Sequence, residues 1–410
     1  MIKKFLSSEL SKGIVILFFS MLVYNFINFI FHFFMGRVLG PNDYGTLAVL
    51  MSMIYLFGIP VEAIQNMITK YTSKFNINNE NGKIKFLMKR ALGKGFYISI
   101  FLFGILIIFS IFLSFFLKVS FWLLLITDLA IFSSFSLPVI RGVLQGRKKF
   151  FKLGNSMIIE TSFKLISSLS LVILGLKVFG AIIGVIFGLL ASLIFSLYFN
   201  KDILQEREEK ISFKYIYSES VPYLIVVVTI LTFFSLDIIL AKRFFSPELA
   251  GQYSVLSMLG KMIFLGTFAI SKAMFPIASE RFEKKENSSQ LFKKSLILIS
   301  ILCLIGIAIY YLFPEEIVWL LYGEKYLEIS HLLVYSAISL SFLSLSNIIL
   351  LYSLSINRIK KGYLLIGFII IEIVLLFALD SSIERYIMGF MISNIVMFIG
   401  SLFSLVEWKI

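Results

Sequence analysis

The chain has 410 residues, of which 59% are hydrophobic and only 15% charged, and its formal net charge is +14. Runs of Phe, Leu and Ile long enough to cross a bilayer many times indicate a polytopic membrane protein. Most Lys and Arg fall on one side of the predicted membrane, so the positive charge follows the positive-inside rule and does not indicate nucleic-acid binding.

The apolar runs are continuous, whereas membrane strands would alternate in short segments, so we expect an all-α membrane protein. The residues before the first run, Met1–Lys12, form a short basic lead. The run that follows is too long for a signal peptide, and we expect it to remain as an anchor. Cys303 is the only cysteine, which excludes an internal disulfide and a cysteine metal cluster.

The first half of the chain contains six candidate spans. Basic segments at Lys70–Lys94 and Arg147–Lys152 interrupt them, and both are assigned to the cytoplasm together with the N-terminus. The predicted spans are Gly13–Met35, Tyr44–Met67, Phe96–Leu117, Phe121–Leu144, Met157–Leu176 and Val178–Phe199.

A polar stretch, Lys201–Lys214, follows and predicts a solvated linker helix between two halves. The second half repeats the plan, again with basic loops, at Arg281–Lys294 and Arg358–Lys361, on the cytoplasmic side. Its predicted spans are Tyr223–Ala241, Gly251–Ile277, Ser295–Leu312, Leu327–Leu354, Tyr363–Leu379 and Tyr386–Val406.

A short repeat links the halves. Arg37–Gly45 and Arg243–Gly251 both read Arg, three residues, Pro, three residues, Gly, and each lies between two long apolar segments. Pro at the first helical position loses no hydrogen bond, and Ser246 before Pro247 is a natural N-cap. We therefore expect each copy to be a tight turn that starts a new membrane helix, and we interpret the repeat as a gene duplication.

An even number of spans per half places both halves in the membrane with the same orientation. Such repeats are related by an axis along the membrane normal. We therefore expect about twelve transmembrane helices in two lobes, residues 1–205 and 206–410, related by a pseudo-twofold axis and enclosing a central cavity. Both termini are expected in the cytoplasm.

Several segments carry a family resemblance. They are GRVLGPNDYGTLAVL at Gly36–Leu50, the basic loop after the second span, LQGRKKF at Leu144–Phe150, and the stretch from Asp237 to Val255 that contains RFFSPELAGQYSV. Together they resemble the oligosaccharide flippases, the polysaccharide-biosynthesis branch of the multidrug/oligosaccharidyl-lipid/polysaccharide exporter superfamily.

The resemblance implies a two-lobe, MATE-like transporter of the cell membrane that is not an enzyme and needs no cofactor. It would move a glycan linked to a polyprenyl or dolichyl (pyro)phosphate from the cytoplasmic to the outer leaflet by alternating access. The implied partners are this substrate, the bilayer and other envelope glycan assembly proteins.

Charged residues within spans are the candidate site residues, because each costs about 2.5–3.5 kcal/mol at a helix centre on insertion scales. A phosphate headgroup crossing the membrane needs cations along its route. The candidates to line a cationic substrate cavity are Lys261, Lys164, Lys272 and Arg141. Each of them could instead pair with a carboxylate and only hold helices together. Glu160, four residues before Lys164, is one such partner.

Three carboxylates are candidates for ion coupling, because burial favours the protonated form. They are Asp237, Asp128 and Glu372, and a salt bridge between Asp237 and Lys261 is the competing interpretation. Arg37 and Arg243 occupy equivalent positions at the predicted outer mouth, as interface anchors or in outer gating.

Two other functions stay open. A multidrug or cation antiporter on the same fold would prefer an acidic, aromatic cavity, so the charge of the cavity wall separates it from a flippase. A membrane glycan polymerase would need a large outer loop with acid-base residues, and the sequence has none. We find no P-loop, dinucleotide fingerprint or metal-binding motif.

Overall fold

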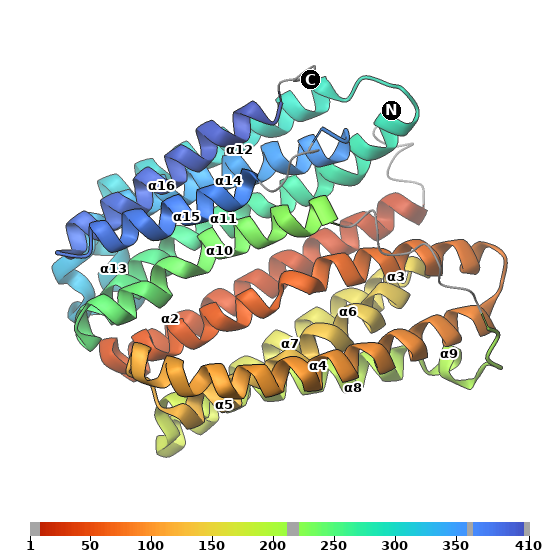
Figure 1. Cartoon of the computed structure of the whole chain (residues 1–410), viewed down its shortest axis with the longest axis horizontal. Coiled ribbons are helices and arrows are strands. Elements are labelled where there is room, and N and C mark those ends of the chain that lie inside the picture. The colour runs from red at the N-terminus through yellow and green to blue at the C-terminus, as the bar shows by residue number, and fades with distance from the viewer. Residues whose placement is uncertain (1–8, 211–220, 359–363, 406–410) are drawn as a thin grey trace. The chain divides into compact units, whose positions relative to one another are not determined.

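The computed structural model describes residues 9–210, 221–358 and 364–405, and within these ranges the chain is helical and contains no strand. Figure 1 shows long helices packed side by side. The prediction of an all-α membrane protein is confirmed, because the described residues include nine segments long and apolar enough to cross a membrane.

These nine segments, together with one shorter apolar helix, correspond to the twelve predicted spans. Phe19–Ile77 contains the first two, Phe150–Phe199 contains the fifth and sixth, and the shorter apolar helix Leu364–Ala378 is the eleventh. The two long segments are broken at Gly40 and Gly175, whose φ angles of 71° and 91° lie in the left-handed region. Glycine adopts this region without strain, so the chain ends one helix and starts the next there.

The helices group into two compact units. Unit 1 comprises Met1–Val38 and Met53–Glu219, and unit 2 comprises Leu39–Ser52 and Ser220–Ile410. The first copy of the repeated turn, from Leu39 onward, therefore belongs to unit 2, although it comes from the N-terminal half of the sequence.

Unit 1 is built around α6, which packs against most of its neighbours. Its helices are α2 (Glu9–Phe57, except for the part in unit 2), α3 (Ile59–Ile77), α4 (Asn81–Leu117), α5 (Phe121–Asp128), α6 (Ala130–Gly146), α7 (Phe150–Leu171), the π-helical turn η1 (Val172–Leu176), α8 (Lys177–Phe199) and α9 (Lys201–Gln205). The closest pairs are α7 with α8 and α3 with α6.

Unit 2 is built around α14, which packs against α10, α11, α12 and α16. Its helices are α10 (Val221–Phe244), α11 (Pro247–Glu283), α12 (Ser289–Leu312), α13 (Pro314–Tyr322), the 3-10 helix η3 (Glu324–Leu332), α14 (Leu333–Ser355), α15 (Leu364–Ala378) and α16 (Ile383–Phe403). Thus α6 and α14, the central helices, carry the fourth predicted span of each half.

Burial follows the same order in both halves. The third and ninth spans, in α4 and α12, are each 17% buried, whereas the fourth and tenth reach 67% and 72%. Equivalent spans therefore have equivalent environments: the third of each half faces outward with apolar side chains, and the fourth is enclosed.

The backbone of each repeated turn accounts for the residue that precedes Pro in that copy. In the second copy Ser246 accepts a hydrogen bond from the Leu249 amide at 3.3 Å and Pro247 opens α11, which confirms the predicted N-cap. In the first copy Gly40 takes the place of Ser246 and turns the chain with its positive φ. The two copies meet within unit 2, since a Cβ built on Gly45 would lie 2.8 Å from the Cα of Gly251.

The predicted linker helix is wrong beyond Gln205. Helix α9 ends there, and the backbone of residues 206–210 runs without helix along the start of α4. The Glu209 amide donates to the Gly82 carbonyl at 3.2 Å, and Lys89 pairs with Glu208 at 2.7 Å. Contacts with α4 thus replace the helical hydrogen bonds that the charge pattern predicted. Residues 211–214 lie outside the described part.

Candidate functional site

Two clusters of charged side chains lie within the membrane-spanning helices, one in each unit. The unit 1 charge cluster comprises Arg141, Glu160 and Lys164, and the unit 2 charge cluster comprises Asp237, Lys261 and Glu372. All six were candidates from the sequence, either for a site or as ion-pair partners, and the structure shows which of them it brings together.

In the unit 1 charge cluster the carboxylate forms an ion pair with Arg141. The guanidinium of Arg141, on α6, donates to Glu160 Oε2 on α7 at 2.6 Å, and both side chains are mostly buried. Two hydroxyls complete the network, because Arg141 also donates to Ser156 Oγ at 3.0 Å and to Ser192 Oγ at 2.8 Å. Arg141 is therefore held by three partners and neutralised by Glu160.

Lys164 is left without a carboxylate of its own. Its ammonium donates to the side-chain oxygen of Asn28 and lies 4.2 Å from the centre of the Phe31 ring. The residue is only 6% exposed, and Glu160, which interacts with it electrostatically, forms its salt bridge with Arg141 instead. The expected pairing with Glu160 is thus replaced by the Arg141–Glu160 bridge, and one positive charge is unmatched.

The helix that contacts Lys164, α2, carries a polar stripe that includes Asn28. Tyr24, Asn28 and His32 recur every four residues, a spacing that places them on one helix face. Asn28 donates to the Tyr24 carbonyl at 2.9 Å, and His32 lies 3.5 Å from the Tyr55 hydroxyl. Asn28, in the middle of this stripe, is the member that accepts a hydrogen bond from the Lys164 ammonium.

In the unit 2 charge cluster the cation is fully matched. Lys261 Nζ, on α11, lies 3.3 Å from Asp237 Oδ1 on α10, and both side chains have 0% exposure. This is the salt bridge that the sequence left open. Its complete burial means that Lys261, in this arrangement, does not line an open surface.

Asp237 accepts hydrogen bonds from several neighbouring side chains. Its other carboxylate oxygen accepts from the Tyr253 hydroxyl at 3.2 Å and from the Ser257 hydroxyl, while its backbone carbonyl accepts from the Tyr386 hydroxyl at 2.6 Å. Tyr253, Ser257 and Lys261 again recur every four residues and share one face of α11. Three donors on one helix therefore converge on one carboxylate.

Glu372 has no such support. It lies on α15 with 0% exposure, close enough to Asp237 and Lys261 for an electrostatic interaction. Neither of its carboxylate oxygens has a hydrogen-bond partner among the described residues. A buried ionised carboxylate is costly unless it is paired, so Glu372 needs a proton or a bound cation.

Asp128, at the end of α5, is a third buried carboxylate and stands apart from both clusters. It has 0% exposure and accepts a hydrogen bond from Ser110 at 2.7 Å. Its second oxygen has no partner among the described residues. The structure brings it together with a hydroxyl rather than with a cation.

The remaining cationic candidates lie away from these clusters. Lys272 is half-buried on α11, and its ammonium lies 4.8 Å from the Phe268 ring centre. Arg37 is exposed and its guanidinium lies 4.9 Å from the Phe33 ring, and Arg243 is also exposed. The roles predicted for these three residues stay predictions.

Sequence reasoning missed the hydroxyl and amide partners. The two stripes of spacing four, on α2 and α11, were the available signal, because residues four apart on a helix share a face. Gln65, on α3, donates to Gln145, on α6, at 2.8 Å and so links two helices. Among the described residues, no group of three His, Cys, Asp or Glu side chains is placed to hold a metal ion.

Comparisons with known proteins identify a family and a shared fold. The model of a family described as "Polysaccharide biosynthesis protein" matches residues 34–331. A comparison with curated proteins finds no match.

Solved structures share the fold. The eukaryotic MATE transporter AtDTX14 is 14% identical with a TM-score of 0.73, over 97% of this chain and 96% of that one. An inward-facing multidrug resistance MATE family transporter of the MOP superfamily is 12% identical, with a TM-score of 0.67 over 93% and 94%. A MOP superfamily transporter from Pyrococcus furiosus is 12% identical, with a TM-score of 0.60 over 96% and 95%.

Proposed function

Because this chain belongs to the polysaccharide biosynthesis protein family, we propose that it is a flippase for a lipid-linked oligosaccharide. It is a multi-pass membrane protein with a MATE-like transporter fold. The proposed substrate is a glycan carried on a polyprenyl or dolichyl (pyro)phosphate. Transport runs from the cytoplasmic to the outer leaflet by alternating access of lobes 1–205 and 206–410.

One observation carries this proposal: the unmatched ammonium of Lys164. A buried cation without a carboxylate partner is unfavourable unless an anion or hydrogen-bond acceptors compensate it. Asn28 supplies one acceptor, so the ammonium keeps donors available for phosphate oxygens. The polar stripe of Tyr24, Asn28 and His32 offers further hydrogen bonds to the headgroup or to the first sugar.

The unit 2 charge cluster supports ion coupling as the driving step. Asp237 and Lys261 neutralise each other, so Glu372 is the surplus carboxylate and takes up a proton or a monovalent cation. Loading it would change the net charge of the cluster by one and so favour one conformation over another. Asp128 is a second position at which a proton could be held.

The remaining predicted site residues are assigned to the substrate route and to its outer mouth. Lys272 would complete the cationic route, and Arg141 would join it in a state in which Glu160 does not neutralise it, while Arg37 and Arg243 would act at the outer mouth. The protein would reside in the cell membrane with both termini in the cytoplasm, where other envelope glycan assembly proteins supply its substrate.

The test is reconstitution in liposomes loaded with a fluorescent polyprenyl-pyrophosphate oligosaccharide in one leaflet. A membrane-impermeant quencher reports the fraction that has crossed. We expect protein-dependent crossing of this substrate and none of a matched neutral polyprenyl glycoside. Equal crossing of both would contradict a cationic headgroup site.

An antiporter for cationic compounds is the second candidate, and the surplus carboxylate Glu372 favours it. The same liposomes decide between them when ethidium is enclosed under a proton gradient. Ethidium export without glycan crossing would replace the flippase proposal.

A further inference from the structure

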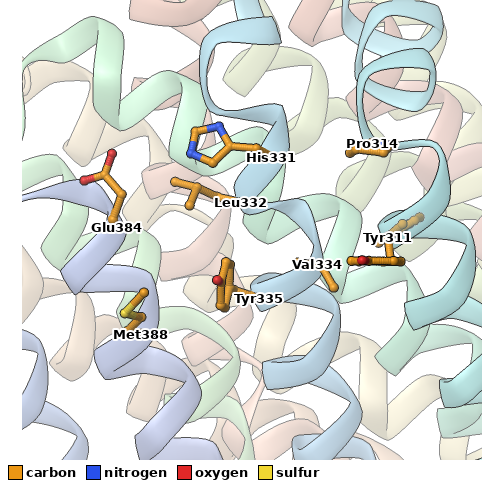
Figure 2. A pocket seen from close by; sticks show the side chains of 9 residues that line it. Tyr311, Pro314, His331, Leu332, Val334, Tyr335, Glu384 and Met388 are labelled. Atoms are coloured by element: carbon orange, nitrogen blue, oxygen red, sulfur yellow. The ribbon is translucent and has the colours of Figure 1, made fainter.

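A pocket of about 440 Å³ lies at the end of unit 2 where α10 turns into α11, the predicted outer end. Figure 2 shows it between the start of α16, the start of α14 and the junction of α12 with α13. Its volume falls within the range of about 300–1,000 Å³ typical of small-molecule sites. It takes no part in either charge cluster.

The walls are aromatic and the polar groups are few. Tyr310, Tyr311 and Tyr335 contribute three phenol rings, and His331 and Glu384 are the only lining residues with ionisable groups besides them. The Tyr310 hydroxyl donates to the Leu259 carbonyl at 3.0 Å, which holds this side chain in place. In Figure 2 His331 and Glu384 lie near one another, and Tyr311 lies across the pocket.

The charge around the pocket selects against anions. No Lys or Arg is among the lining residues, and acidic side chains follow in α13 and η3: Glu315, Glu316, Glu324 and Glu328. The basic residues of this end, Lys325, Arg385 and, in the last turn of α10, Lys242 and Arg243, lie outside the lining. Arg385 donates to Ser381 at 3.3 Å. Phenol faces combined with a carboxylate are the groups that bind an ammonium ion.

The surroundings indicate an amphiphile rather than a free amine. Helix α12, which supplies Tyr310 and Tyr311, exposes Leu304, Ile305 and Leu312 by 64%, 50% and 63%. On the short helix α13 Trp319 and Leu320 are exposed by 54% and 61%, as in segments that lie in the membrane interface. An apolar chain can therefore lie along α12 while its head enters the pocket.

We propose that this pocket binds the ammonium headgroup of an aminophospholipid of the outer leaflet, with Glu384 as counter-ion and the tyrosine rings as its walls. The site is separate from the proposed flippase function and does not depend on it. An outer-leaflet lipid bound here would brace α12, α14 and α16 against one another at their outer ends.

Native mass spectrometry of the delipidated protein tests this assignment with phosphatidylethanolamine and phosphatidylglycerol as the two probes. Phosphatidylethanolamine should be retained at least fivefold more than phosphatidylglycerol, and dodecyltrimethylammonium, which has no phosphate, should displace it. Equal retention of the two lipids, or displacement by a maltoside instead of the amine, would overturn the proposal.

Two variants and two matched controls complete the experiment. Glu384→Gln and Tyr311→Leu should each lower phosphatidylethanolamine retention at least fivefold. Glu316→Gln, an exposed acid outside the pocket, and Tyr97→Leu, 75% exposed against 70% for Tyr311, should leave it unchanged. Circular dichroism melting should be the same for all four. Wild-type retention by both pocket variants would assign the lipid to non-specific contacts and end the proposal.

Discussion

The two charge clusters differ in the sign of their surplus. In unit 1 two cations, Arg141 and Lys164, face one carboxylate, and the unmatched charge is an ammonium. In unit 2 two carboxylates, Asp237 and Glu372, face one cation, and the unmatched charge is a carboxylate. The same six-span plan therefore carries opposite surplus charges in its two copies.

This difference shows how the two copies of a duplicated fold can bind different kinds of ion. Each cluster contacts or includes a stripe of residues four apart on one helix, through Asn28 on α2 in unit 1 and through Lys261 on α11 in unit 2. The identity of one or two side chains sets the sign of the surplus charge. A surplus cation suits an anionic headgroup, and a surplus carboxylate suits a proton or cation. Five predictions test this comparison, in order of expected effect.

The largest effect should come from Lys261→Met, which leaves Asp237 and Glu372 buried together without a cation. Breaking one side of a buried ion pair costs about 3–5 kcal/mol of stability. Thermal unfolding in detergent should show a correspondingly lower midpoint. The double variant Lys261→Met with Asp237→Asn should recover most of the loss, and failure to recover it would argue against the pair as the cause.

Gly251→Ala tests how closely the two copies of the repeated turn pack against each other. An added Cβ would meet the Pro41 backbone carbonyl, and overpacking of this kind costs about 1–3 kcal/mol. Gly266→Ala on the same helix has nothing within 4 Å and should stabilise instead, because Ala favours helix over Gly. Equal melting of the two variants would contradict the close contact.

Lys164→Met should abolish most transport while leaving the fold intact. No carboxylate loses its partner, since Glu160 stays with Arg141, so the melting midpoint should change little. Crossing of the pyrophosphate glycan in liposomes should fall at least tenfold, about 1.4 kcal/mol of lost interaction. Lys94→Met, an exposed lysine of unit 1, is the control. A stable variant with wild-type transport would remove Lys164 from the substrate route.

Glu372→Gln removes the surplus carboxylate and is the counterpart of Lys164→Met in unit 2. Stability at neutral pH should not fall, because the carboxylate has no hydrogen-bond partner among the described residues to lose. The transport rate measured across pH should lose its dependence on a proton gradient. Unchanged coupling in this variant would move the coupling site elsewhere, with Asp128→Asn as the next variant to measure.

The smallest effect should come from Asp202→Asn, a solvated ion pair that contrasts with the buried ones. Hydrogen bonds from Arg147, reinforced by Lys149, hold the pKa of Asp202 below its ordinary value of 3.8. Its folded pKa is depressed, so its contribution is present above pH 4 and is lost as the pH falls through the folded value. Exposed pairs contribute roughly 0.2–1 kcal/mol, and salt should weaken this one. A variant as destabilised as Lys261→Met would contradict this ranking.

Much of the fold followed from local pattern. Long apolar runs are helices in a membrane whatever their neighbours, because only helices satisfy every backbone group within one segment. The Ser246 cap and the turn of each repeat were readable for the same reason, since Ser, Pro and Gly act on their own backbone. The linker was misjudged because its partner, the start of α4, lies more than a hundred residues away in the sequence.

The sequence by itself determined which residues are charged within the membrane, and therefore which ones must find compensation. Only the tertiary structure decided which charges pair. Arg141, and not Lys164, forms the ion pair with Glu160, and Asp237 pairs with Lys261. Glu372 has no hydrogen-bond partner among the described residues. The identity of each side chain is given directly by its position in the sequence. Pairing depends on distances between helices far apart in the chain, and packing sets those distances.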